Sequence, residues 1–222
     1  MSVFKIQDVC YSYDEGKTEV LHHINYEFEK GKTYAIVGKS GTGKTTLLSL
    51  MSGLDKPTSG RVMYNNRDIT GMDEDTYRSQ HVGVVFQSFN LLPHLTALEN
   101  VELSMDVAGL KLKDKKHKAL NLLEEVGLNE EKAARRVLRL SGGEQQRVAI
   151  ARALSYNPEV ILADEPTGNL DSHTEEQIME IFKTLASQKN KCVIIVTHSP
   201  SVSKNVDVVY NLEKTNQSGK TK

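Results

Sequence analysis

The chain has 222 residues, enough for one large domain or for a core with a smaller subdomain. Its 28 basic and 29 acidic residues give a formal net charge of -1, which provides no field to attract nucleic acid or anionic lipid. The two cysteines, Cys10 and Cys192, show no CxxC spacing, so we expect reduced thiols. The N-terminal residues lack an apolar signal-peptide core, and no run of about 18 apolar residues predicts a membrane span.

In chain order, the first third predicts strands around one helix. Apolar residues alternate with polar ones near the start of the chain, and short apolar runs follow between glycine-rich turns. The expected strands cover 24–28, 33–37, 61–66 and 81–87. The segment 45–52 predicts a helix with Gly53 just beyond its end, where a left-handed conformation is common.

Residues 88–155 are expected to be almost wholly helical. Thr96 and Glu99 have the spacing of a capping box, Gly109 and Gly127 mark two helix ends, and Asn129 is placed to cap a third helix. We therefore expect a helical subdomain at 88–155, inserted in an α/β core with a β subdomain formed by 1–87 and 156–212. A polar tail, expected to be disordered, covers 213–222, and the whole chain of 1–222 forms one domain.

The segment GKSGTGKT fits the pattern G-x-x-x-x-G-K-[ST] and lies between an expected strand and an expected helix. It consists of Gly38, Lys39, Ser40, Gly41, Thr42, Gly43, Lys44 and Thr45. In this pattern the backbone N–H groups surround phosphates, the lysine reaches the β- and γ-phosphates, and the last hydroxyl binds Mg²⁺. The alternative is a glycine-rich structural turn, but the strand and helix on either side favour a phosphate loop.

Polar residues also follow the later apolar strands. Asp164 and Glu165 come directly after the run 160–163, at the edge of a parallel sheet where ligands bind. Asp164 suits Mg²⁺, and Glu165 suits the orientation or deprotonation of an attacking water. Gln87 and His198 also end apolar strands, although a single residue of either kind is more commonly a plain surface residue. Tyr13 could stack on a base or simply pack.

The segment LSGGEQQR begins a strong helix with two glycines, which are poor helix formers. Ser141, Gly142, Gly143 and Glu144 offer a hydroxyl, two unobstructed N–H groups and a helix N-terminus, which together form a second anion-binding device. By itself this segment could be an ordinary helix cap. Two phosphate cradles in one chain are difficult to explain with one nucleotide, unless a second copy of the chain completes the site.

The order of GKSGTGKT, Gln87, LSGGEQQR, VILADE, NLD and His198 resembles the nucleotide-binding subunit of ATP-binding cassette (ABC) transporters, over about residues 3–212. The phrases VFQSFNLLPHLTALENV and DEPTGNLDS are similar to the branch of lipoprotein-release, macrolide-export and antimicrobial-peptide-export ATPases. The resemblance implies a P-loop NTPase with a RecA-like core, an antiparallel β subdomain and an inserted α-helical subdomain. It also implies two ATP molecules, with Mg²⁺, at the interface of a head-to-tail homodimer.

The resemblance further implies roles for individual residues. Residues 38–46, which include Thr46, would hold the phosphates, and Tyr13 would stack on adenine. Ser141 and Gly143 would contact the γ-phosphate held by the other subunit, and Asp171 would couple the two sites. The implied catalytic residues are Glu165 as base, His198 on the γ-phosphate and Gln87, while Thr45, Gln87 and Asp164 would serve Mg²⁺.

The chain departs from the family pattern in two places. Lys39 replaces a frequent proline, and the usual final hairpin is altered in VYNLEKTNQSGKTK. We expect the ATPase subunit of a bacterial transporter, bound to a transmembrane permease on the cytoplasmic face of the membrane and engaged in export or extraction. An alternative within the resemblance is a cell-division or mechanotransmission ATPase. A DNA- or ribosome-associated ATPase is disfavoured because the charge is neutral and long coiled coils are absent.

Overall fold

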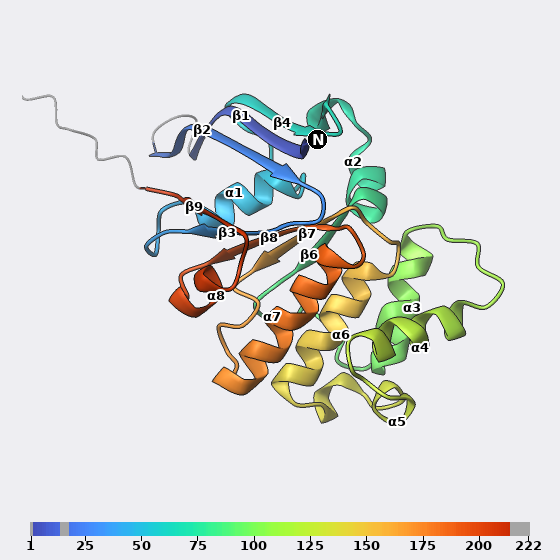
Figure 1. The fold of residues 1–222 in the computed structure, drawn as a ribbon. Helices are drawn as coiled ribbons and strands as arrows, with labels where there is room; N and C mark the ends of the chain where they lie inside the picture. The colour runs from blue at the N-terminus through green and yellow to red at the C-terminus, as the bar shows by residue number, and fades with distance from the viewer. Residues whose placement is uncertain (1, 14–17, 214–222) are drawn as a thin grey trace, which may run out of the picture.

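The computed structural model describes residues 2–13 and 18–213 and forms two sheets with helices around them (Figure 1). The elements follow one another as β1 (Ser2–Tyr13), β2 (Thr18–Glu29), β3 (Thr33–Val37), α1 (Lys44–Met51), β4 (Ser59–Tyr64), β5 (Arg67–Asp68), η2 (Ile69–Gly71), α2 (Glu74–Thr76), η3 (Tyr77–His81), β6 (Val82–Val85), α3 (Ala97–Val107), α4 (Lys115–Glu125), α5 (Glu130–Ala133), η4 (Val137–Arg139), α6 (Gly142–Leu154), β7 (Val160–Asp164), α7 (Ser172–Ser187), β8 (Cys192–Thr197), α8 (Pro200–Lys204) and β9 (Val208–Asn211).

The five-stranded sheet is parallel and has the strand order β6-β7-β8-β3-β9. The strands β3, β7 and β8 are short apolar runs buried on both faces, as expected for a parallel sheet covered by helices. Alternate residues therefore pack on opposite sides. Leu162 and Ile194 belong to the hydrophobic core that contains α1, whereas Ile161 and Val193 belong to the core that contains α6 and α7.

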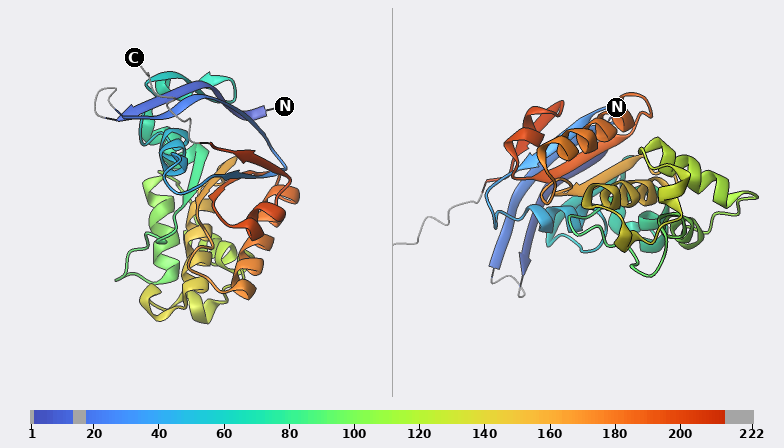
Figure 2. Two further views of the ribbon diagram at one scale, coloured as in Figure 1. Left: turned by 90° about the vertical axis from the view of Figure 1, so that its left-hand side faces the viewer. Right: turned by 90° about the horizontal axis from the view of Figure 1, so that it is seen from below.

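The second sheet has four antiparallel strands in the order β2-β1-β4-β5. Helix α1 lies between this sheet and the parallel sheet, and the helices from α3 to α7 lie on the far side of the parallel sheet (Figures 1 and 2). The helix that follows the phosphate loop is therefore enclosed by apolar residues of both sheets, such as Phe4 and Ile36. This packing fixes the loop at the carboxyl edge of β3.

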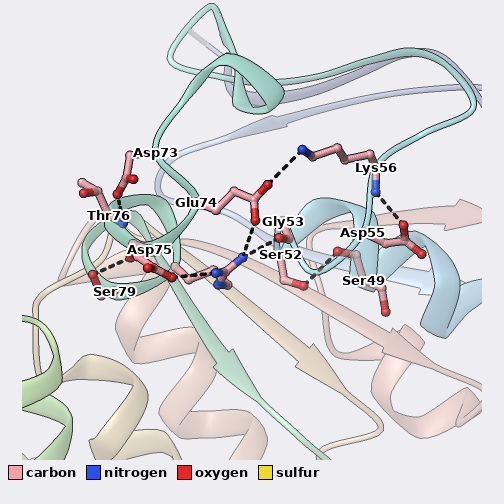
Figure 3. Close-up of polar contacts among 11 residues, drawn as sticks. Ser49, Ser52, Gly53, Asp55, Lys56, Asp73, Glu74, Asp75, Thr76 and Ser79 are labelled. Carbon is pink, nitrogen blue, oxygen red and sulfur yellow. Dashed lines mark hydrogen bonds and ion pairs between the residues drawn. The ribbon is translucent and has the colours of Figure 1, made fainter.

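The C-terminal end of α1 is tied to the segment 73–81 by polar contacts (Figure 3). The guanidinium of Arg78 donates to the Gly53 carbonyl at 2.8 Å and also pairs with Asp75. Lys56 reaches Glu74 at 2.9 Å, as Figure 3 shows. Because a cation near the end of a helix complements the helix dipole, Arg78 stabilises the end of α1 remote from the phosphate loop.

Several local predictions are confirmed by the backbone. Thr96 and Glu99 form both bonds of a capping box, and the Asn129 side chain accepts the N–H of Lys132 at the start of α5. Gly53, Gly109 and Gly127 all adopt positive φ just beyond helix ends. Each of these signals is local in sequence, which is why the sequence could predict it.

Other predictions need correction. The region 88–155 is less continuously helical than expected: residues 88–95 form no helix, and α3 starts at the capping box of Thr96, as its spacing predicted. The helix expected at 45–52 is α1, which ends at Met51. The segment 69–80, for which we expected no element, contains three short helical turns, and the last of them includes His81, where we expected a strand to begin. Of the expected tail, residues 214–222 lie outside the described part of the chain.

Candidate active site

The loop between β3 and α1 has the backbone of a phosphate cradle. Gly41 and Gly43 adopt φ of 76° and 95°, conformations that favour glycine. A Cβ atom at Gly43 would also lie 2.8 Å from side-chain carbons of Val20 and Leu21, which pack behind the loop. Glycine is therefore required at this position of the loop, because no side chain fits there.

Lys44 begins α1 and reaches back over the loop. Its Nζ atom donates to the carbonyl oxygens of Gly38 at 2.8 Å and Lys39 at 3.1 Å. The ammonium group is therefore held within the concave side of the loop, at the positive end of α1. A lysine and a helix N-terminus that converge in this way attract phosphate.

The loop borders a cavity of about 730 Å³ at the carboxyl edge of the parallel sheet. Most of the residues that the sequence singled out meet around it. The lining residues are Tyr13, Thr18, Val20, Ser40, Gly41, Gly43, Lys44, Thr45, Thr46, Gln87, Asp164, Glu165 and His198. Gly38, Lys39 and Thr42 lie instead on the other side of the loop, in a second cavity with Leu212 and Glu213, which Ser40 also lines. Thr18 and Val20 had no sequence signal.

Three oxygen-bearing side chains suited to a divalent cation line the main cavity. The Thr45 hydroxyl, the Asp164 carboxylate and the Gln87 amide line the same space. Burial raises the pKa of Asp164, as does the neighbouring charge of Glu165, while Thr45 and Lys44 oppose the rise. Mg²⁺ is commonly held by one or two protein oxygens together with substrate phosphates and water, so these residues fit it.

Glu165 follows β7 and is held from the neighbouring strand β8. Its Oε2 atom accepts a hydrogen bond from Thr197 Oγ1 at 2.9 Å, and its Oε1 atom lies 2.6 Å from His198 Nδ1. The backbone of Glu165 has φ of 43°, which is unusual for a non-glycine residue. Thr197 was missed by sequence reasoning; its place directly before His198 at a strand end was the available signal.

Tyr13 lies at the rim of the cavity and keeps 45% of its surface exposed. Its hydroxyl is 2.9 Å from Thr46 Oγ1, and its ring packs edge-on against Tyr11. Both interpretations of Tyr13 from the sequence remain compatible with this position, because the ring packs against Tyr11 and still keeps much of its surface accessible to a ligand.

The second predicted anion-binding device, Ser141 to Glu144, does not line the main cavity. Ser141 is the N-cap of α6 and forms a capping box with Glu144. The two glycines differ in their surroundings. A Cβ at Gly142 would lie 3.6 Å from its nearest neighbour, a Leu170 carbon, whereas a Cβ at Gly143 would lie only 2.4 Å from Thr174 Cγ2. Gly143 therefore has an intramolecular reason to be glycine that the sequence did not reveal.

Asp171 likewise lies outside the cavity lining, as the N-cap of α7. It accepts hydrogen bonds from the Thr174 N–H at 3.0 Å and from the Thr174 hydroxyl at 2.7 Å. The side-chain bond from Thr174 is the main cause that lowers the pKa of Asp171. Thr174 thus connects the N-cap of α7 with the start of α6 within one subunit.

A strand, a glycine loop and a helix, with carboxylates at the end of another strand of the same parallel sheet, define a P-loop nucleotide-binding ATPase. The model of the family described as ABC transporter matches residues 21–168, more than half of the chain. The chain belongs to this family. It is an ATP-binding subunit of the ABC type and an ATPase.

Named relatives and solved structures agree with this assignment. The chain is 46% identical to the uncharacterized ABC transporter ATP-binding protein YclH of Bacillus subtilis, over 96% of this chain and 95% of that protein. It is 43% identical to the lipoprotein-releasing system ATP-binding protein LolD of Legionella pneumophila, over 94% of this chain and 93% of that protein.

Two solved structures of the cassette MJ0796 have the same fold. The first is titled as a dimeric structure of a bacterial ABC transporter cassette, with a TM-score of 0.85 and 40% identity over 95% of this chain and 94% of that one. The second, described as a post-hydrolysis state bound to ADP and Pi, has a TM-score of 0.85 and 39% identity over 96% of both chains. In the described part of the present chain, no helix has the length and apolarity needed to cross a membrane.

Proposed function

We propose that this ATPase powers a membrane permease by pairing head to tail with a second copy when ATP binds. One observation carries the proposal: the Ser141 turn has the features of an anion-binding device but takes no part in lining the cavity of its own subunit. We infer that the Ser141 turn binds the phosphates held in the cavity of a second subunit. The dimeric form named for the related cassette supports this arrangement.

In the proposed site, Lys44 and the N–H groups of 38–46 bind the β- and γ-phosphates, and Tyr13 stacks on the base. Thr45, Gln87 and Asp164 hold Mg²⁺, which supplies neutralisation of the phosphate charge when bound. Lys44 already has its ammonium within the loop, so phosphate oxygens would replace the carbonyl oxygens it now contacts. This exchange of carbonyl for phosphate oxygens needs little movement of the Lys44 side chain.

Glu165 is proposed as the group that orients water and accepts its proton. The bond from Thr197 holds one carboxylate oxygen, while the other faces His198. Because His198 uses Nδ1 for this contact and is largely exposed, its Nε2 atom is the ring nitrogen left to face the γ-phosphate. Ser141 and Gly143 of the second subunit complete the site, and Asp171 couples the two sites.

The transport role is proposed from the relatives. Several are named as transporter ATP-binding proteins, and one group is named for lipoprotein release. We infer export or extraction, with the chain attached to the cytoplasmic face of the membrane through its permease. The permease would select the transported substrate, since we assign the cavity described above to the nucleotide.

The test is the variant Glu165→Gln, which keeps the size of the side chain and removes the base. We expect it to bind ATP, to dimerise as measured by light scattering, and to lose most of its ATP hydrolysis. Hydrolysis near the wild-type rate would contradict the role of Glu165. A nucleotide-saturated variant that stays monomeric, also with permease present, would contradict the composite site.

A further inference from the structure

An ion pair joins α5 to the start of α6 beside the turn that we assign to the partner's phosphate. Lys132 Nζ lies 2.7 Å from Glu144 Oε1. The other carboxylate oxygen, Oε2, accepts the Ser141 N–H at 2.8 Å, and the Glu144 N–H is directed at Ser141 Oγ at 3.3 Å. Lys132 therefore holds the residue that shapes the turn.

This hydrogen-bond pattern fixes what the Ser141 hydroxyl can do. Because Ser141 Oγ accepts the Glu144 N–H, its own proton remains for a ligand. A hydroxyl oriented in this way donates to an anion such as a phosphate oxygen. The capping box is thus compatible with anion binding, and it also presets the direction of the donor.

The same pattern places a negative charge beside the proposed anion site. The hydrogen bond from Lys132 is the largest cause that lowers the pKa of Glu144, so this carboxyl is ionised at neutral pH. A carboxylate so close to a triphosphate would repel it, and only 22% of the Glu144 side chain is exposed, which limits screening by solvent. The charge needs compensation if the turn is to bind phosphate.

Among the described residues, Lys132 is the cation within ion-pair distance of Glu144. Arg147, one turn further along α6, instead donates to the Val126 carbonyl and to Gln177. Lys132 comes from a different helix, and its own backbone N–H is held by the N-cap Asn129. Its side chain is therefore anchored close to Glu144 by the fold of α5.

We propose that Lys132 is a positioning residue of the composite ATP site: it neutralises Glu144 and holds the capping box, so that Ser141 can donate to the triphosphate bound by the second subunit. The inference rests on the proposed head-to-tail function. It assigns the lysine no contact with the nucleotide, and this distinguishes it from a residue that binds phosphate directly.

The experiment measures the dimer dissociation constant at saturating ATP and Mg²⁺ by analytical ultracentrifugation, with all variants built on Glu165→Gln. We expect Lys132→Met to raise the dimer dissociation constant by up to about five-fold for each of the two turns. In a symmetric dimer, which contains both turns, the total increase would be up to roughly 25-fold. The loss should shrink in high salt, because screening reduces the repulsion. Lys132→Arg should retain the dissociation constant of the Glu165→Gln parent.

The decisive variant combines Lys132→Met with Glu144→Gln. The amide keeps an oxygen that accepts the Ser141 N–H but carries no charge, so the dimer should recover. Lys189→Met is the matched control, since Lys189 forms an exposed ion pair with Glu125 at 3.0 Å away from this turn, and it should leave dimerisation unchanged. Thermal melts of every variant establish that the comparison is made between folded chains.

Two outcomes would overturn the inference. One is a Lys132→Met chain that dimerises as tightly as its parent. The other is a weakened chain that Glu144→Gln does not restore, which would mean that Lys132 acts on the nucleotide itself. A parent Glu165→Gln chain that fails to dimerise would instead overturn the proposed function, so the two failures are distinguishable.

Discussion

The two adjacent glycines at the start of α6 should respond in opposite ways to alanine. In Gly143→Ala the new Cβ would lie 2.4 Å from Thr174 Cγ2, a distance far below van der Waals contact. The Thr174 methyl group cannot rotate away freely, because its hydroxyl is bound to Asp171 at 2.7 Å. Relief of the clash must break that bond or shift α6 against α7.

Overpacking of this kind costs about 1–3 kcal/mol of folding free energy, and we expect Gly143→Ala to fall in that range. In Gly142→Ala the Cβ would meet a Leu170 carbon at 3.6 Å, an ordinary contact. Because alanine also restricts the unfolded chain, Gly142→Ala should be neutral or stabilising by up to about 1 kcal/mol.

Urea unfolding followed by circular dichroism measures both effects. The rescue variant is Gly143→Ala with Thr174→Ser, which removes Cγ2 and keeps the hydroxyl bound to Asp171. It should recover most of the lost free energy of unfolding, whereas Thr174→Ser alone should change it little. Equal stability of the two alanine variants, or no recovery in the double variant, would refute the packing argument.

Three further predictions concern the site and its support. Thr197→Val removes the hydroxyl that holds Glu165, so kcat should fall roughly ten-fold with KM for ATP nearly unchanged, and Thr197→Ser should restore the rate. Gly43→Ala places a Cβ against Val20 and Leu21 at positive φ, so ATP titration should show weaker binding; an affinity equal to the wild type would contradict the loop geometry. Burial acts to raise the pKa of Glu159, but hydrogen bonds led by that from Lys30 outweigh it and hold the pKa at about 2. Ionised Glu159 therefore stabilises the fold at pH values above 4.5, the ordinary pKa of its carboxyl group, and this contribution disappears as the pH falls towards 2. The free energy of unfolding of Glu159→Gln, plotted against pH, should therefore be flatter in that interval.

The parts of the site that the sequence predicts are those coded by short local patterns. The phosphate loop depends on glycines at fixed spacing, and Asp164 and Glu165 meet it because parallel strands end at one edge of the sheet. Gln87 and His198 line the same cavity for that reason, although each is weak evidence in isolation.

The other contacts that shape the site depend on packing between segments that are distant in sequence, and such packing leaves no local pattern in the sequence. The contact of Gly143 with Thr174 joins two helices, and the ion pair of Lys132 with Glu144 joins two others. The sequence favoured a single explanation for both glycines of the turn, access to a phosphate. The structure separates them, since a Cβ at Gly142 would meet its neighbours at ordinary contact distance, whereas Gly143 is required by helix packing.

The most direct test of the composite site is a crystal structure of Glu165→Gln with ATP and Mg²⁺. We predict that each triphosphate contacts residues 38–46 of one chain together with Ser141 and Gly143 of the other, with Lys132 still paired to Glu144. A nucleotide that contacts one chain alone, with the Ser141 turn facing solvent, would contradict the central claim.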